Sequence, residues 1–203
     1  MGRIGRTSLK IILETPELEL VAVNDIASID NIAYLIKYDS VHGTFEKDIQ
    51  AGENQLIIDG KSIAFFSERN PEQLPWGKLG IDIVIESTGI FTKREDAEKH
   101  IKAGAKTVVL SGPSKSPDVP TVVHGVNTAD GQASIFSCAS CTTNNISPVM
   151  EIIGRRIGIK KAIMTTIHAD TASNNTVDAT HKKDFRMGRS GLNNLIPTTT
   201  GAA

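Results

Sequence analysis

Short apolar runs alternate with segments of helical periodicity along most of the chain. The runs at 18–23, 81–85, 107–110 and 134–137 have the length and the β-branched content of buried strands. Helical segments separate them, and this alternation is typical of a parallel sheet that is covered by helices. The hydrophobic pattern therefore predicts an α/β fold.

The boundaries of the helical segments can be placed from local signals. The first helix is expected to end before Thr15-Pro16, because the residue before a proline avoids helical geometry. A capping box of Thr92 and Glu95 is expected to open another helix, and Gly104 is expected to close it. The expected helices are about 5–13, 31–38, 92–104 and a segment that runs through Met150 to about Ile157.

Two strands with a tight turn interrupt this alternation. The apolar segments 55–58 and 61–65 flank Asp59-Gly60, a two-residue sequence that favours a β-hairpin. We therefore expect an antiparallel pair at this point of the otherwise parallel sheet.

The character of the chain changes after Ser140. A strand is expected over Lys161–Ile167, but 169–190 is polar, has no periodicity, and is longer than most loops without a binding or catalytic role. We predict a dinucleotide-binding domain over 1–140 and the first part of a catalytic domain over 141–203.

Composition narrows the class of protein. The chain is 39% hydrophobic and 22% charged with a net charge of −1, which is ordinary for a globular protein and gives no reason to expect nucleic acid as a partner. No apolar run is long enough to cross a bilayer, and the first residues lack the apolar stretch of a secretory signal. We expect a cytoplasmic protein with no membrane partner, and two cysteines are too few for a disulfide framework.

Gly2-Arg-Ile-Gly5 at the start of a helix is a candidate for binding a phosphate group. Asp25 follows the next strand about twenty residues later, where dinucleotide-binding folds carry the acid that binds the ribose hydroxyls. A plain turn explains the two glycines equally well. The complete fingerprint needs another glycine and a preceding strand, so we expect a Rossmann-type domain whose first strand is missing.

Cys141 is a candidate nucleophile because it follows a strand and begins a helix. A helix start favours a thiolate through its free N–H groups and its dipole. A buried, unreactive cysteine is the alternative. His168 is a candidate general base, although a histidine that follows an apolar strand can also be purely structural.

Several motifs in order resemble the phosphorylating glyceraldehyde-3-phosphate dehydrogenase family. They extend over essentially the whole chain, and their combined spacing is much more specific than any one of them. They are Gly2-Arg-Ile-Gly-Arg6, Asn24-Asp25, Tyr38-Asp-Ser40, Glu86-Ser-Thr-Gly-Ile-Phe-Thr92, Ser140-Cys-Thr-Thr-Asn144, Thr165-Thr-Ile-His168 and Pro197-Thr-Thr-Thr-Gly-Ala-Ala203.

The resemblance implies a mechanism and a set of site residues. Cys141 would attack the aldehyde of glyceraldehyde 3-phosphate with His168 as base, and inorganic phosphate would cleave the resulting thioester to give 1,3-bisphosphoglycerate. Matching positions suggest one phosphate site at Ser140, Thr142, Thr200 and Gly201, and parts of a second at Thr171 and Arg186. No metal ion is implied.

The resemblance also implies a nicotinamide cofactor. Arg3 and Ile4 match backbone contacts to the pyrophosphate, Asp25 matches the ribose ligand, and Arg69 and Ser111 match positions near the adenosine half. Asp25 favours NAD, whereas Ala179-Thr180 resembles the pair found in NADP-tolerant members, so NADP remains possible. A homotetramer is implied, because the 169–190 loop reaches a neighbouring subunit in the family.

The chain also departs from the family pattern. Asp170 stands where tyrosine is usual, Ser190-Gly-Leu192 replaces an alanine-rich stretch, and Cys138 creates a C-x-x-C spacing with Cys141 that makes a redox switch conceivable. Asp170 either raises the pKa of His168 or points to solvent.

The family pattern extends beyond both ends of this chain. We therefore expect a fragment that is itself inactive and poorly folded, from an active parent. The alternatives are an erythrose-4-phosphate dehydrogenase, a noncatalytic truncated product that binds nucleotide or partners, and a hydrolase that uses Cys141 and His168.

Overall fold

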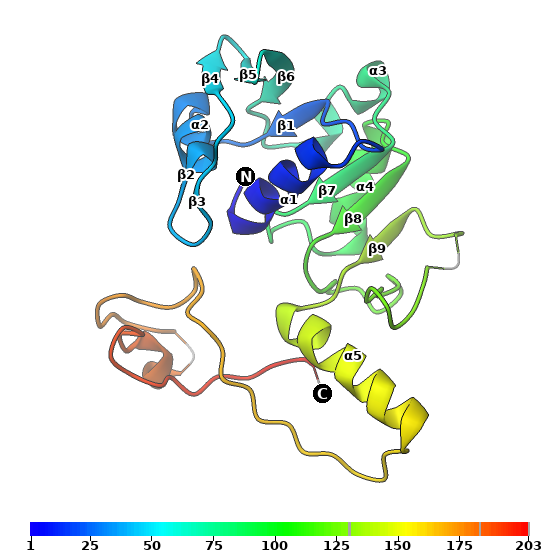
Figure 1. Ribbon diagram of the computed structural model, residues 1–203, viewed down its shortest axis with the longest axis vertical. Helices are drawn as coiled ribbons and strands as arrows, with labels where there is room; N and C mark the ends of the chain where they lie inside the picture. The colour runs from blue at the N-terminus through cyan, green and yellow to red at the C-terminus, as the bar shows by residue number, and fades with distance from the viewer. Residues whose placement is uncertain (130, 183, 203) are drawn as a thin grey trace. The chain divides into compact units, whose positions relative to one another are not determined.

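The computed structural model describes residues 1–129, 131–182 and 184–202 (Figure 1). It divides into two compact units, Met1–Ala139 and Ser140–Ala203. The domain boundary predicted from the sequence lies after residue 140, one position beyond this division.

The first unit contains strands, helices and one short 3₁₀ helix in an alternating order. Its elements are α1 (Arg3–Glu14), β1 (Ala22–Asn24), α2 (Ile29–Lys37), β2 (Tyr38–Asp39), β3 (Gly43–Thr44), β4 (Ile49–Gly52), β5 (Gln55–Ile58), β6 (Lys61–Phe66), η1 (Pro71–Gln73), α3 (Trp76–Leu79), β7 (Ile83–Glu86), α4 (Arg94–Lys102), β8 (Thr107–Leu110) and β9 (Ile135–Ser137).

Two main sheets form in this unit. One has the order β1-β6-β5-β4, in which β1 and β6 are parallel and the rest are antiparallel, and the other is the fully parallel β7-β8-β9. The predicted α/β class is confirmed. In the described part of the chain β1 hydrogen-bonds only to β6 and β7 only to β8, so each has one edge without a strand partner.

An apolar cluster packs α1 and α2 against the four-stranded sheet. Leu9 of α1 and Ile36 of α2 are almost completely buried there, together with Leu56, Ile58 and Ile63 of the hairpin strands. Burying one such side chain stabilises a fold by about 1.5–3 kcal/mol, so this cluster is the main source of stability on that side of the unit.

Two further clusters hold the parallel sheet. Val108, Leu110 and Ile135 pack with α4, which covers β8 and β9 (Figure 1). Leu74, Trp76 and Ala105 form a third cluster, and Ala22 of β1 and Val84 of β7 both pack against it. The two main sheets therefore share an apolar contact region.

The hairpin between β5 and β6 confirms the turn prediction. Asp59 and Gly60 both have positive φ angles, of 49° and 78°, and Ile58 pairs with Lys61 across the turn. Positive φ at both central residues is the geometry of a type I′ turn, which matches the twist of the flanking strands.

The predicted capping box of Thr92 and Glu95 is wrong. The helix α4 begins one residue later, with Lys93 at its N-cap and no side-chain cap from that residue. The Arg94 N–H instead donates to Ser116 Oγ at 3.0 Å, and the buried Thr92 Oγ1 has no hydrogen-bond partner among the described residues. A loop distant in sequence therefore caps this helix.

The second unit contains α5 (Cys141–Arg156) and the short 3₁₀ helix η2 (Phe185–Gly188). No residue of α5 is buried. The strand predicted over Lys161–Ile167 is absent, because no described segment pairs with this run, and Ile163 and Ile167 are 99% and 89% exposed. None of the described helices is both long and apolar enough to span a membrane.

Candidate active site

The start of α5 presents Cys141 at the first helical position. Ser140 is the N-cap residue, and its Oγ accepts a hydrogen bond from the Thr143 N–H at 3.0 Å. Ala139, directly before this cap, has a φ of 64°, a conformation that is uncommon for a residue with a side chain. Backbone strain of this kind concentrates at functional sites.

Cys141 and His168 are in direct contact. Their Sγ and Nε2 atoms lie 3.0 Å apart, and both residues are exposed. His168 Nδ1 lies 2.6 Å from the carbonyl oxygen of Ala169, which can only accept, so Nδ1 carries a hydrogen. Nε2 is then free to take the thiol proton, and the two predicted catalytic residues form a thiol–imidazole pair.

The pKa values of the pair shift in opposite directions. The hydrogen bond with His168 lowers the pKa of Cys141 against the opposing effect of burial, and the backbone of Thr142 lowers it further. The Ala169 carbonyl raises the pKa of His168, and the contact with Cys141 raises it further. Both shifts favour the thiolate–imidazolium state, which is the reactive form of a cysteine nucleophile.

Cys138 behaves differently from Cys141. Cys138 is half-buried, and burial raises the pKa of its thiol. Its N–H donates to the Leu110 carbonyl oxygen at 2.9 Å, at the end of the parallel sheet. Two cysteines three positions apart therefore have opposite tendencies to ionise.

Asp170 is not the partner of His168. Its carboxylate lies against Gly191, where an added Cβ would come within 2.5 Å of Oδ2. The groups that raise the pKa of His168 are Ala169 and Cys141, and Asp170 is not among them. Two departures from the family pattern, Asp170 and Gly191, thus contact each other.

The other predicted substrate residues make local contacts. Thr171 Oγ1 hydrogen-bonds to Ser173 and Asn174, and Thr200 Oγ1 accepts from Ala202. A Cβ added at Gly201 would have no neighbouring atom within 4 Å. Among the described residues, no hydrogen bond or ion pair joins Thr171, Thr200 or Gly201 to Cys141.

Arg186 is engaged by an acid of its own segment. Its guanidinium lies 2.7 Å from Asp184, and this contact lowers the pKa of Asp184 to about 2 and raises the pKa of Arg186. Both side chains are at least partly exposed, so an anionic ligand would compete with Asp184 for this guanidinium.

The start of α1 has the features expected of a pyrophosphate site. Gly2 is the N-cap, no side chain caps the helix, and the first turn contains no acidic residue. Gly5 lies close to Ser87, because a Cβ added at Gly5 would be 2.8 Å from Ser87 Oγ and this hydroxyl would have to rotate away. Ile4 is exposed, and the Arg3 guanidinium pairs with Asp39 at 2.7 Å and holds the pKa of that carboxyl well below its usual range.

Asp25 follows β1, as predicted. Its Oδ1 accepts from the Ala27 N–H at 2.8 Å, and its Oδ2 pairs with the Met1 ammonium group. Burial acts to raise the pKa of Asp25, but these two hydrogen bonds and the charges of Met1 and Arg6 lower it overall. The carboxylate is therefore ionised and lies next to the start of α1.

The segments that carry Arg69 and Ser111 also follow strands. Asn24 exchanges two hydrogen bonds with the backbone of Glu68, which fixes the loop of Arg69 beside the end of β1. The Ser111 N–H donates to the Glu86 carbonyl oxygen at 3.0 Å. All the predicted cofactor residues lie at the carboxyl ends of parallel strands or at a helix start, where open α/β sheets bind ligands.

A buried polar group beside these residues was not predicted from the sequence. Glu86 ends β7, and His100 of α4 and Trp76 of α3 form a hydrogen-bonded chain with it. The available signal was the acidic residue in Glu86-Ser-Thr-Gly89, because a strand end is a poor place for an unpaired carboxylate.

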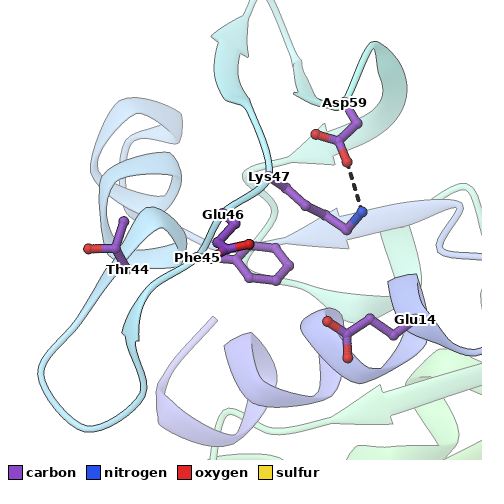
Figure 2. Close-up of a pocket in the computed structure, with 6 residues that line it drawn as sticks. All are labelled: Glu14, Thr44, Phe45, Glu46, Lys47 and Asp59. Atoms are coloured by element: carbon purple, nitrogen blue, oxygen red, sulfur yellow. Dashed lines mark hydrogen bonds and ion pairs between the residues drawn. The ribbon is translucent and has the colours of Figure 1, made fainter.

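A hollow of about 520 Å³ lies elsewhere on the first unit (Figure 2). Glu14 at the end of α1, the 44–47 segment and Asp59 of the hairpin line it, and Lys47 pairs with Asp59 at 2.7 Å. It contains none of the predicted site residues.

The features of the two units indicate a dinucleotide-binding protein with a cysteine nucleophile. The first has the parallel β/α arrangement and glycine-started helix of dinucleotide-binding folds, and the second carries an activated cysteine–histidine pair at a helix start.

Comparison with known proteins identifies the family. A family model described as the NAD binding domain of glyceraldehyde 3-phosphate dehydrogenase matches residues 1–94, and one described as its C-terminal domain matches residues 140–203. The chain belongs to the glyceraldehyde-3-phosphate dehydrogenase family.

Individual relatives match over the full chain. It is 48% identical to the glyceraldehyde-3-phosphate dehydrogenase of Clostridium pasteurianum, 48% to glyceraldehyde-3-phosphate dehydrogenase 1 of Trichormus variabilis and 50% to that of Kluyveromyces lactis. Each alignment covers 100% of this chain and 60% or 61% of the relative. The chain therefore spans about three fifths of the length of the relatives it matches.

Proposed function

We propose that the protein containing this chain is a phosphorylating glyceraldehyde-3-phosphate dehydrogenase. The reaction converts glyceraldehyde 3-phosphate, inorganic phosphate and NAD to 1,3-bisphosphoglycerate and NADH. The observation that carries the proposal is the 3.0 Å contact between Cys141 Sγ and His168 Nε2, at the residues that match the nucleophile and base of the family.

The pair accounts for both halves of the reaction. The Cys141 thiolate adds to the aldehyde carbon, and the imidazolium of His168 donates its proton to the oxygen, which gives a thiohemiacetal. His168 then takes the hydroxyl proton back as the carbon is oxidised to a thioester. A phosphate oxygen attacks the thioester, the carbon–sulfur bond breaks, and Cys141 leaves as a thiolate with the acyl phosphate as product.

The residues of the first unit suit a dinucleotide. NAD, when bound, accepts the hydride that the thiohemiacetal carbon loses. Arg3 and Ile4 would contact its pyrophosphate at the uncapped start of α1, where free N–H groups and the helix dipole favour a phosphate group. Asp25 would accept the ribose hydroxyls, and the exposed Arg69 and the half-buried Ser111 would lie near the adenosine half.

Two groups of residues would bind the phosphates of the reactants. Ser140 and Thr142 adjoin Cys141 at a helix start, and with Thr200 and Gly201 they would form one site. Thr171 and Arg186 would contribute to the second. Arg186 suits this role because its guanidinium can bind phosphate oxygens in a bidentate way once it leaves Asp184.

The cofactor preference, the oligomeric state and the location of the protein are proposed on the basis of the same family membership. NAD is the expected cofactor, because the ionised Asp25 would repel a 2′-phosphate, and use of NADP is the second possibility. The 169–190 segment, most of whose described residues are exposed, would contact a neighbouring subunit in a homotetramer. We place the protein in the cytoplasm, with no nucleic-acid or membrane partner.

The test is aldehyde-dependent reduction of NAD, and separately of NADP, by the full-length protein with and without inorganic phosphate. We expect phosphate-dependent turnover with glyceraldehyde 3-phosphate that falls by at least about a thousandfold in Cys141→Ser, because the hydroxyl is a much weaker nucleophile. Cys138→Ser is the matched control and should retain activity.

The same assay separates the competing functions. Turnover that prefers erythrose 4-phosphate and does not need phosphate would identify an erythrose-4-phosphate dehydrogenase. Ester hydrolysis without NAD would identify a hydrolase. Nucleotide binding without turnover by the full-length protein would contradict the proposal and favour a noncatalytic role.

A further inference from the structure

A chain of hydrogen bonds joins three elements of the first unit. Trp76 Nε1 of α3 donates to His100 Nδ1 of α4 at 3.0 Å, and His100 Nε2 lies 3.1 Å from Glu86 Oε2 at the end of β7. Glu86 and His100 are only 6% and 4% exposed, and Trp76 is 5% exposed. The proposed reaction uses none of these three residues.

The donors and acceptors in this series of hydrogen bonds determine the protonation state and the tautomer of His100. The indole nitrogen of Trp76 can only donate, so His100 Nδ1 must be an unprotonated acceptor. The ring hydrogen is then on Nε2 and points at Glu86, which must accept it. A proton on Nδ1 would face the Trp76 N–H, so the arrangement requires neutral His100 in a single tautomer.

The other oxygen of Glu86 holds the loop that follows β7. Glu86 Oε1 accepts from the Thr88 N–H at 2.7 Å and also from the Thr88 hydroxyl. The Ile90 N–H in turn donates to Thr88 Oγ1 at 3.1 Å. With the bond from His100, the buried carboxylate has three donors, which compensate for the loss of water around its charge.

This loop touches the nucleotide side of the unit at two points. Ser87, between Glu86 and Thr88, packs against Gly5 in the first turn of α1, where an added Cβ would be 2.8 Å from Ser87 Oγ. The Glu86 carbonyl oxygen accepts from the Ser111 N–H. A shift of Glu86 would therefore move the helix start and Ser111 relative to each other.

We propose that Trp76, His100 and Glu86 are positioning residues that hold the 87–90 loop and, through it, the nucleotide site. The inference rests on the proposed function for the identity of the ligand, a nicotinamide dinucleotide. Neutral His100, held in a single tautomer, sets the affinity for that ligand without touching it.

Glu86→Gln is the informative single substitution, because it keeps the shape and removes one acceptor. If the amide oxygen accepts from Thr88, the amide N–H points at the Nε2–H of His100, and two donors face each other. A change of tautomer would move the ring hydrogen to Nδ1, where it would face the N–H of Trp76. We expect the dissociation constant for NAD, measured by calorimetry on the full-length protein, to rise roughly tenfold. Glu95→Gln, at an exposed position of α4, should change it less than about twofold.

A second substitution should relieve that conflict. Trp76→Phe removes the indole donor, so His100 can carry its hydrogen on Nδ1 and accept from the amide introduced by Glu86→Gln. We expect Trp76→Phe/Glu86→Gln to bind NAD more tightly than the product of the two single losses predicts. A residue that merely fills space would not show this rescue, and Trp76→Phe alone still tests the histidine if Glu86→Gln fails to fold.

Spectroscopy reads the network directly. The ¹⁵N shifts of His100 should show hydrogen on Nε2 in the natural protein and on Nδ1 in the double variant. Trp76 is the one tryptophan of these 203 residues, and the fluorescence that Trp76→Phe removes from the full-length protein is its contribution. NAD should change that fluorescence in the natural protein and not in Glu86→Gln.

The possible results are decisive. If the natural protein binds NAD and Glu86→Gln binds it equally well, the positioning role is wrong while the proposed function stands. Simply additive losses, or an Nδ1–H tautomer in the natural protein, would also overturn it. If the natural protein binds no dinucleotide, the proposed function fails first and this inference fails with it.

Discussion

The two units of the chain are organised by different forces. In Met1–Ala139, three apolar clusters hold the helices against two sheets, and the polar residues at the ends of strands depend on that packing. In Ser140–Ala203, α5 has no buried residue, and the cysteine–histidine pair is held by a helix cap and a neighbouring carbonyl group.

The difference shows which parts of a site need a core. A thiol–imidazole contact can be made by local hydrogen bonds, since Cys141 needs a helix start and His168 needs one acceptor for its second nitrogen. The nucleotide side needs the packed sheet, because segments from α1, β1, β6, β7 and β8 must meet there. Substitutions of matched type in the two units should therefore have different effects.

The largest contrast is expected for isoleucine. Ile63→Ala in β6 removes a side chain that is 0% exposed and should lower the free energy of unfolding by about 2–5 kcal/mol. Ile163→Ala, at a 99% exposed position, should change it by less than about 0.5 kcal/mol. Urea unfolding followed by Trp76 fluorescence for the first unit and by circular dichroism for the second measures the two effects, and equal effects would show that the first unit lacks an independent core.

A similar contrast is expected for glycine. Gly104→Ala puts a side chain at a φ of 106° and within 2.4 Å of the Gly77 Cα, so we expect a loss of about 2–4 kcal/mol. In Gly191→Ala the three atoms nearest the added Cβ all belong to the exposed Asp170 carboxylate, which can rotate away, so the substitution should cost less than about 0.5 kcal/mol. Hydrogen exchange around the two glycines would measure both losses of stability. Much faster exchange around Gly191 in Gly191→Ala would contradict the predicted difference.

The rates of alkylation of the two cysteines should depend on pH in different ways. Because the pKa of Cys141 is lowered and that of Cys138 is raised, the alkylation of Cys141 should persist to lower pH. Rates with iodoacetamide in Cys138→Ser and in Cys141→Ser report each thiol alone, and at pH 7 the Cys141 rate should be severalfold higher.

His168→Gln sharpens that comparison. Removing the imidazole should move the Cys141 profile up toward the ordinary thiol range of roughly 8.5, because the largest stabiliser of the thiolate is lost. The Cys138 profile should not move. Coincident profiles for the two thiols in the natural chain would show that His168 does not pair with Cys141 in solution.

The smallest effect concerns the helix that carries the nucleophile. Ser140→Ala removes the acceptor of the Thr143 N–H and should destabilise α5 by about 1 kcal/mol. Ser147→Ala, inside the same helix, is the control and should slightly favour the helix. Circular dichroism of the two variants tests this, and equal helicity would mean that the cap contributes nothing.

Much of the fold could be predicted from local patterns. The strands of the parallel sheet, the Asp59-Gly60 turn and the helix after Cys141 were predicted because their signals lie within a few residues. Thr92 was predicted to cap α4 and does not. The hydroxyl of Ser116, more than twenty positions away, accepts the hydrogen bond from the first turn of the helix instead.

The candidate site shows the same division. Cys141 and His168 could be predicted from motifs, and the structure brings their reactive atoms together. Asp170 could not be placed from sequence, and its neighbour is Gly191. The strand expected over Lys161–Ile167 did not form, because a strand needs a hydrogen-bonding partner as well as an apolar pattern.

The sequence alone determined the family, the α/β class and the residues with reactive chemistry, since these depend on residue types at fixed spacings along the chain. Tertiary structure alone decided which ends of strands meet, which loop caps α4 and that Trp76, His100 and Glu86 form one buried chain. Residues far apart in sequence carry no local sign of such contacts, because hydrogen bonds and packing depend on distances that only the folded chain defines.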